Sequence, residues 1–392
     1  MKTRSVILLV IAEMAALSLW FVSAAILPDM LREVTISPFR QAAMSSGVQV
    51  GFVAGALVSA FFGISDRVDP RRFFAACAWS AALANGLLVM TEAGSAVAIT
   101  LRFLTGMLLA GVYPVGMKIA VGWGTRDRGF LVGSLIGALT LGSALPYLIV
   151  LSGGADWRFT VIVTSIAAAM AGLLALGAAL GPHHSKATSF DIRVITSAWT
   201  NRRVRLAYAG YLGHMWELYA MWAWVGVAAA ASYRVTLEAE AAQTWATVTA
   251  FVAIGAGAIT CVIAGQFADR IGKARIAALA MAGSGTAAIL TGLSFGGPVW
   301  ITLLLFIVWG ATIVPDSAQF SALVADASPP EHAGSLMTFQ TALGFTLTFF
   351  TVQVTPLVER AWGWPNVFYI LALGPVFGIA AMLRLMRMGD GH

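Results

Sequence analysis

Apolar residues in this chain come in long runs separated by short polar turns. A helix needs about 20 apolar residues to cross the hydrocarbon core of a bilayer, and twelve runs approach or exceed that length. They cover residues 5–27, 43–64, 73–91, 96–122, 129–151, 158–180, 205–231, 242–266, 276–294, 298–322, 333–357 and 365–386. The pattern predicts an all-α membrane protein with twelve transmembrane helices.

One polar connection is longer than the others and separates the first six runs from the last six. We expect a first six-helix bundle over 1–181, a cytoplasmic linker over 182–204 and a second bundle over 205–392. Lys and Arg collect on the cytoplasmic side of a membrane, and with the amino terminus inside, about seventeen of them lie there against about five outside. Both termini are therefore predicted to be cytoplasmic, in a multi-pass protein of the cell inner membrane.

Composition agrees with a chain that is solvated by lipid. Hydrophobic residues make up 59% of the sequence and charged residues 11%, whereas a soluble domain carries about 25% charged residues. The net charge of +6 comes from basic residues dispersed in short loops, so we expect membrane orientation and no nucleic-acid partner. Cys77 and Cys261 lie inside apolar runs and offer no disulfide framework. The first run is too long for a cleaved secretory signal.

Several landmarks recur after about half of the 392 residues. The pairs are Asp66-Arg67 with Asp269-Arg270, Glu13 with Glu217, and Pro114 with Pro315. Their separations are 203 (269 − 66), 204 (217 − 13) and 201 (315 − 114) residues. A repeat with so constant an offset predicts a duplicated six-helix unit. Paired repeats with a site at their interface are the architecture of secondary transporters.

The charged turn of the second half carries a recognisable motif. Its residues are Gly265, Asp269, Arg270, Gly272 and Lys273. This spacing resembles the signature loop of the major facilitator superfamily, which joins helices 2 and 3 and again helices 8 and 9. The turn of the first half keeps Asp66 and Arg67 but has Phe62 and Asp69 where that loop has glycine. The resemblance implies two six-helix bundles related by a pseudo-twofold axis, with these loops as gates, in a monomer without cofactors.

Five ionisable residues fall well inside the predicted helices. They are Glu13, Arg102, His214, Glu217 and Asp316. An intramembrane charge costs about 2.5–3.5 kcal/mol even on the lenient insertion scale, so such residues mark function by default. They lie on predicted helices 1, 4, 7 and 10, and the resemblance implies that these four helices line the central cavity.

The sequence leaves the roles of these residues open. We expect Glu217 to be the acid that couples transport to protons, with Glu13 as the second choice. Either acid can instead be a fixed partner of Arg102 or His214. Arg102 suits an anionic substrate or a role in holding Glu13 charged, and the two readings are balanced. His214 and Glu217 share a helix face, but a buried histidine bonded to a neighbour is commoner than a metal ligand, so no metal is expected.

The favoured function is secondary active transport of a small organic solute, coupled to protons. A phosphate-binding loop and a nucleophile motif are missing from the sequence, so neither an ATP-driven pump nor an enzyme is expected. Proton-linked efflux of a drug or metabolite is the alternative, since Gly133, Gly137 and Gly142 partly match the antiporter motif of the family. A membrane sensor that does not transport is the alternative from another class.

Overall fold

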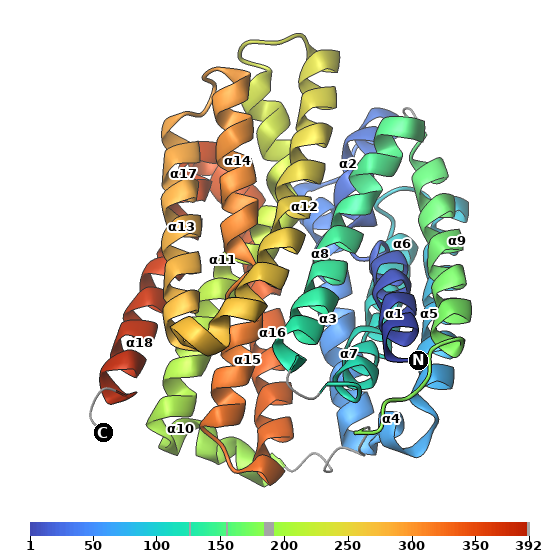
Figure 1. Cartoon of the computed structure of the whole chain (residues 1–392). Coiled ribbons are helices and arrows are strands. Elements are labelled where there is room, and N and C mark those ends of the chain that lie inside the picture. The colour runs from blue at the N-terminus through green and yellow to red at the C-terminus, as the bar shows by residue number, and fades with distance from the viewer. Residues whose placement is uncertain (125–126, 154–155, 184–191, 390–392) are drawn as a thin grey trace.

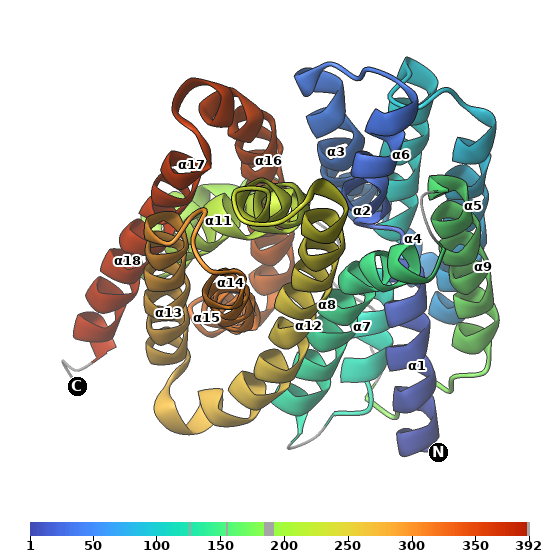
Figure 2. The same cartoon turned by 90° about the horizontal axis from the view of Figure 1, so that it is seen from above.

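In the computed structural model the chain is a bundle of long helices, and the structure describes residues 1–124, 127–153, 156–183 and 192–389 (Figure 1). Within those ranges there is no strand. Seen from above, the helices before the linker gather on one side and those after it on the other (Figure 2). The two groups meet along α8 and α12 and along α3 and α16.

The first group contains nine α-helices and one 3₁₀ turn in the described part of the chain. They are α1 (Lys2–Leu17), α2 (Val22–Glu33), α3 (Pro38–Phe62), α4 (Ile64–Arg67), α5 (Pro70–Gly86), η1 (Leu87–Met90), α6 (Ala96–Leu109), α7 (Tyr113–Val121), α8 (Arg128–Gly153) and α9 (Trp157–Leu176).

The second group begins with two short helical pieces of the linker, which lead into the long helix α11. The elements are η2 (Ile192–Thr196), α10 (Ser197–Thr200), α11 (Arg202–Tyr233), α12 (Ala239–Ile271), α13 (Lys273–Leu293), α14 (Val299–Ile313), α15 (Ser317–Asp326), α16 (Pro330–Trp362), α17 (Trp364–Leu371) and α18 (Leu373–Gly389). The limits 1–181, 182–204 and 205–392 for bundles and linker stay predictions.

Eleven helical segments of the described chain are long and apolar enough to cross a membrane. The remaining pass is α11, a helix of 32 residues. Three of its first four residues are arginines, and His214 and Glu217 lie near its middle. Most of α11 is buried among its neighbours, so protein rather than lipid solvates these polar groups. The predicted twelve-helix, two-bundle arrangement is confirmed.

Four of the twelve passes, which we number in chain order, are broken: passes 1, 4, 10 and 12, the last between α17 and α18. Pass 4 breaks between α6 and α7, and pass 10 breaks between α14 and α15, in both cases next to a repeated proline, Pro114 or Pro315. Proline removes a backbone donor and disrupts the helix around it. Pass 1 breaks between Leu17 and Val22 without a proline. The predicted span over residues 5–27 is therefore one pass made of two helices.

Small residues let the two groups approach closely. A Cβ added to Gly133 or Gly137 of α8 would lie 3.0 Å from a carbonyl oxygen of α12, that of Cys261 or Ala258. At Gly265 of α12 it would lie 2.7 Å from the carbonyl oxygen of Gly129. Helices pack this tightly only where small residues face one another. The glycines of α8 that partly match the antiporter motif therefore have a packing role in the structure.

An aromatic cluster also joins the two groups at the level of the break in pass 1. Its rings are Trp20, Phe21 and Phe52 from the first group, and Tyr219, Trp222 and Phe345 from the second. Ring centroids lie 5.6 Å apart for Trp20 and Phe345 and 4.9 Å apart for Phe52 and Phe345. Trp20 and Trp222 are thus buried at the boundary between the halves.

Candidate functional site

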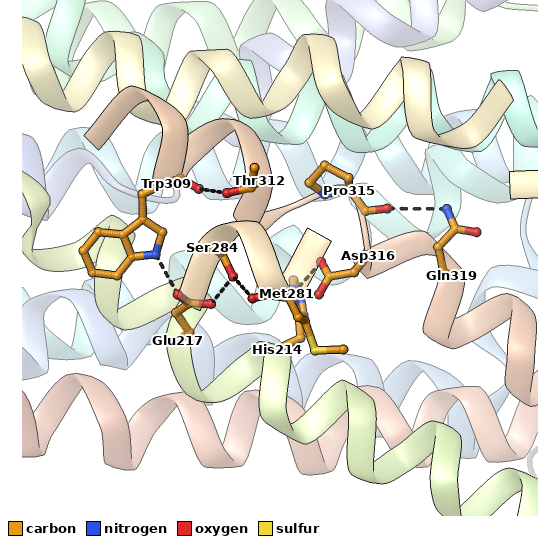
Figure 3. A network of polar contacts seen from close by, with 9 residues as sticks. All are labelled: His214, Glu217, Met281, Ser284, Trp309, Thr312, Pro315, Asp316 and Gln319. Carbon is orange, nitrogen blue, oxygen red and sulfur yellow. Dashed lines mark hydrogen bonds and ion pairs between the residues drawn. The ribbon is translucent and has the colours of Figure 1, made fainter. Parts of the chain in front are cut away.

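Glu217 lies in a buried hydrogen-bond network of the second half (Figure 3). Trp309 of α14 donates its indole N–H to Oε1 of Glu217 at 2.7 Å, and Ser284 of α13 donates its hydroxyl to Oε2 at 2.8 Å. The side chain is 1% exposed. Because both oxygens accept a bond from a different helix, Glu217 connects passes 7, 9 and 10. Neither Arg102 nor His214 is its partner, although the sequence allowed both.

His214, one turn before Glu217 on α11, faces Asp316 at the break of pass 10 (Figure 3). The His214 Nδ1 and Asp316 Oδ1 atoms are 2.9 Å apart, and both side chains are almost fully buried. The pair carries two charges only when the histidine is protonated. Rings of Tyr211 and Phe320 pack near the imidazole, with centroids 6.1 and 5.8 Å away. The structure therefore joins His214, Glu217 and Asp316 in one polar region, of which the sequence foresaw the members but not the pairing.

Glu13 is the counterpart of Glu217 in the first half and has different surroundings. It is fully buried, and neither carboxyl oxygen has a hydrogen-bond partner. Its carboxyl group packs against Gly116 of α7. A Cβ added to Gly116 would lie 2.0 Å from Oε1 of Glu13. Tyr113, just after the break of pass 4, lies within electrostatic reach of Glu13 and also of Tyr211 and Cys261 in the other half. Glu13 therefore lies next to the boundary between the halves.

The hydrogen bonds of Arg102 go to neither acid and instead close the break in pass 1. Its guanidinium donates to the carbonyl oxygens of Leu19 and Trp20, both at 2.8 Å, and to Oδ1 of Asn85 at 2.8 Å. Asn85 in turn donates to Ser165 of α9 at 2.9 Å. A broken helix leaves carbonyls without partners, and a buried unpaired carbonyl is costly. Arg102 satisfies two of these carbonyls. Its observed contacts therefore support neither of the two roles expected from the sequence, binding an anionic substrate or holding Glu13 charged.

The two charged turns differ as their sequences suggest. In the second, Gly272 has a φ of +97° between α12 and α13, a conformation that favours glycine. Lys273 binds Asp326 at the end of α15. In the first, Asp69 instead caps α5 and binds Arg71 at 2.7 Å. Arg67 belongs to α4.

The second turn also borders open space. Arg270 and Gln266 of α12 line a cavity of about 290 Å³ together with Asp127 and Phe130 of the first half. Asp127 itself binds Lys2 near the amino terminus, at 2.7 Å. The side chains of Asp66 and Asp269 lie outside the described part of the structure, so their predicted gating role is untested.

Several site residues were not singled out from the sequence. Trp309, Ser284 and Asn85 sit in apolar or small-residue runs where they read as packing. Trp309 and Ser284 both lie between the second charged turn and Pro315. Their spacing from these two landmarks matches no known motif. The available signal was the repeat itself, since a break near Pro114 and Pro315 predicts that the acids of passes 1 and 7 lie beside passes 4 and 10.

Comparisons with known proteins agree with this architecture. The sequence profile of the Major Facilitator Superfamily matches residues 8–352. No curated protein sequence matches the chain significantly. Among solved structures, a partially occluded inward-open conformation of the xylose transporter XylE from E. coli superposes with a TM-score of 0.73 at 13% identity, over 98% of this chain and 97% of that one.

A mutant of the nucleoside transporter NupG gives a TM-score of 0.72 at 13% identity, over 97% of this chain and 99% of that one. XylE bound to 6-bromo-6-deoxy-D-glucose gives 0.70 at 13% identity, over 98% and 96%. At this identity the structures establish the fold, and the sequence profile establishes the family. The chain belongs to the Major Facilitator Superfamily and is a multi-pass transporter rather than an enzyme.

Proposed function

We propose that this chain moves a small organic solute across the cell inner membrane by alternating access, and that protons drive the movement. The observation that carries the proposal is the buried pair of His214 and Asp316, with Glu217 one helical turn away. Burying an ionisable group inside the membrane costs free energy, and such groups commonly mark sites that bind or relay ions. Pass 10 is broken next to this pair.

We assign proton coupling to this pair and not to Glu217, the acid expected from the sequence, because Glu217 is held by hydrogen bonds from Ser284 and Trp309. When a proton binds Asp316, its attraction for a protonated His214 is lost, and the contact between α11 and the start of α15 weakens. When the proton leaves, the contact forms again. Since pass 10 is already interrupted between Ile313 and Ser317, α15 can tilt more easily than the end of a continuous helix. Protonation would thereby bias the position of one cavity-lining helix, as an ion-coupled transporter requires.

The structural neighbours are compatible with this proposal. One is described as a proton:xylose symporter and another as a nucleoside transporter. Both carry small organic solutes, although 13% identity transfers no substrate to this chain. We propose a monomer with both termini in the cytoplasm, and direction of transport is left to experiment.

Reconstitution into proteoliposomes tests the proposal. A thermal-shift screen over amines, carboxylates and sugars first identifies a ligand, because a ligand that binds the folded form stabilises it. Vesicles loaded with that ligand should then take up labelled ligand by saturable counterflow, and an imposed pH gradient should accelerate uptake. Net uptake that does not respond to the pH gradient would contradict proton coupling. A bound ligand without any counterflow would favour the sensor alternative.

A further inference from the structure

Resting on the proposed function, we infer that the solute is an organic cation with an apolar body, and that Glu13 is the residue that binds its charge. The inference begins with the buried acids. Among those in the described part of the chain, Glu217 accepts two hydrogen bonds and Asp316 is paired with His214. Asp29 is paired with Arg32. Glu13 is left with neither a hydrogen bond nor an ion pair.

A bare carboxyl group in a protein interior is expensive, since a buried charge needs a partner or a proton. Glu13 has no such partner within its own half, where Arg102 is occupied by Asn85 and by the carbonyls of Leu19 and Trp20. A charged group on the bound solute would offset the free-energy cost of burying the Glu13 carboxylate. Because the carboxylate is negative, that group carries positive charge.

The rings around the site fit the same chemistry. Tyr113 lies within electrostatic reach of Glu13 and of Tyr211, and Tyr219 lies within reach of both tyrosines. The negative faces of aromatic rings attract cations, and several rings together recognise quaternary ammonium groups. Tyr113 is only partly buried. Tyr113 thus adds an aromatic ring near the unpaired carboxylate, as recognition of an ammonium group requires.

The aromatic cluster provides a place for the rest of the solute. Trp20 follows Glu13 by seven residues and lies beyond the end of α1, in the break of pass 1. Its indole N–H has no hydrogen-bond partner. Gln49 lies one turn from Ser46, which bonds to Gln353 of the other half, and its side-chain amide is also unpartnered. A solute that extends from Glu13 to this cluster would meet these donors, so an acceptor group at its far end would be recognised.

The same observations argue against an anion. An anionic solute needs a free cation at the boundary, and Arg102 donates its bonds to backbone and Asn85 within the first half. His214 faces Asp316, whose carboxylate would repel an anion. The surroundings of Glu13 thus oppose the reading in which Arg102 binds a small anion.

Binding of three matched probes tests the inference on the full-length protein in detergent. The probes are benzyltrimethylammonium, benzyl alcohol and benzoate, which share a ring and differ in charge. Tryptophan fluorescence during heating reports stabilisation at increasing probe concentration. We expect saturable stabilisation by benzyltrimethylammonium and little by the other two. Stabilisation by benzoate, or by none of the three, would overturn the cation assignment.

Variants locate the site. Glu13→Gln should weaken benzyltrimethylammonium binding at least tenfold, while Glu240→Gln, on the exposed first turn of α12, should leave it unchanged. The melting temperature without probe shows whether each variant is folded. Equal binding by wild type and Glu13→Gln would overturn the role of Glu13.

Transport assays separate this inference from the proposed function. If another ligand shows counterflow and the cation does not bind, transport stands and the cation inference fails. If the cation binds through Glu13 but no counterflow occurs, the binding site stands and the transport proposal fails.

Discussion

Glu13 and Glu217 occupy equivalent places in the two halves, 204 residues apart (217 − 13), but they meet opposite surroundings. Glu217 is held by Ser284 and Trp309, and its neighbour His214 is paired with Asp316. Glu13 has no partner at all. The duplicated framework thus preserves the position of an acid beside a broken pass but not its chemistry. We take the difference as a division of labour, with protons bound in the second half and solute charge in the first.

The largest expected effect comes from Asp316→Asn, which removes the proton-binding group but keeps the shape of the side chain. Removing a proton-transfer residue costs about 100-fold or more, so uptake driven by a pH gradient should fall by that factor. Counterflow, which needs no net proton movement, should stay within a few-fold of wild type. Both rates are measured in the same proteoliposomes.

Asp326→Asn provides the matched control, because Asp326 ends the same helix α15 and is more than half exposed in its pair with Lys273. Its effect on either rate should be small. If Asp316→Asn still responds fully to the pH gradient, the proton site does not lie in the second half and the proposed division of labour is wrong.

Arg102→Leu addresses a feature of the first half that the second half lacks. The repeat offset of 201 to 204 residues maps Arg102 onto the apolar stretch 303–306, and α11 has no break for an arginine to close. Leucine at 102 leaves two carbonyls and Asn85 Oδ1 unpaired, each at about 1–3 kcal/mol. We expect a loss of roughly 3 kcal/mol or more and a clear drop in melting temperature.

The control for that variant is Arg234→Leu, since Arg234 is exposed at the end of α11. Its melting temperature should change little. A melting temperature of Arg102→Leu equal to that of wild type would mean that the contacts of Arg102 with pass 1 do not stabilise the fold, and the reading of Arg102 as an anion site would return.

The break in pass 1 shows where sequence reasoning stops. Hydrophobic run length predicted the twelve passes, and Pro315 predicted the interruption of pass 10, because a proline acts on its own helix. Residues 18–21 read as an ordinary apolar stretch. Their conformation depends on Arg102, which arrives from another pass 82 residues away. A tertiary contact of this kind leaves no local pattern in the sequence.

The candidate site was predictable to a similar degree. The five ionisable residues of the candidate site could be identified from the sequence because charged residues are rare inside membrane helices. The free-energy cost of burying a charge applies to each residue separately. Pairing was not predictable, since it depends on which face of α11 meets pass 10. The sequence therefore named His214, Glu217 and Asp316, but it left open whether an acid of pass 1 or 7 is a fixed partner of Arg102 or His214, whereas in the structure Asp316 is the partner of His214.

Gly116→Ala tests whether Glu13 needs the space it now has. An added methyl group would lie 2.0 Å from Oε1 of Glu13, so the carboxyl group must move, and overpacking of this kind costs about 1–3 kcal/mol. We expect a lower melting temperature together with weaker binding of benzyltrimethylammonium. Fluorescence melting curves with and without the cation give both quantities.

Gly47→Ala is the matched glycine, because an added Cβ there has no neighbour closer than 3.6 Å. Alanine favours a helix over glycine by up to about 1 kcal/mol, so this variant should be neutral or slightly more stable. Equal behaviour of the two variants would show that the contact between Gly116 and Glu13 places no constraint on the site.

The smallest expected effect comes from Asp69→Asn in the first charged turn. Asp69 stands where the signature loop has a glycine, as the second turn does at Gly272. Hydrogen bonds from Arg71 lower the pKa of Asp69 to about 2 from its ordinary 3.8. Because the folded pKa is the lower one, the stabilisation is complete above about pH 4 and is lost as pH falls toward 2. Asp69→Asn keeps the cap of α5 but removes the charge, so we expect a cost below about 1 kcal/mol for this partly exposed pair.

Melting temperatures of wild type and Asp69→Asn at pH 6 and pH 3 measure that contribution, and the gap between the two proteins should narrow at the lower pH. Asp156→Asn supplies the comparison, since Asp156 caps α9 in the same way but is 63% exposed, where solvent and salt screen its charge. A gap at Asp69 that does not change with pH would mean that the cap acts through its shape alone. The two turns would then differ in backbone geometry at Gly272 and not in electrostatics.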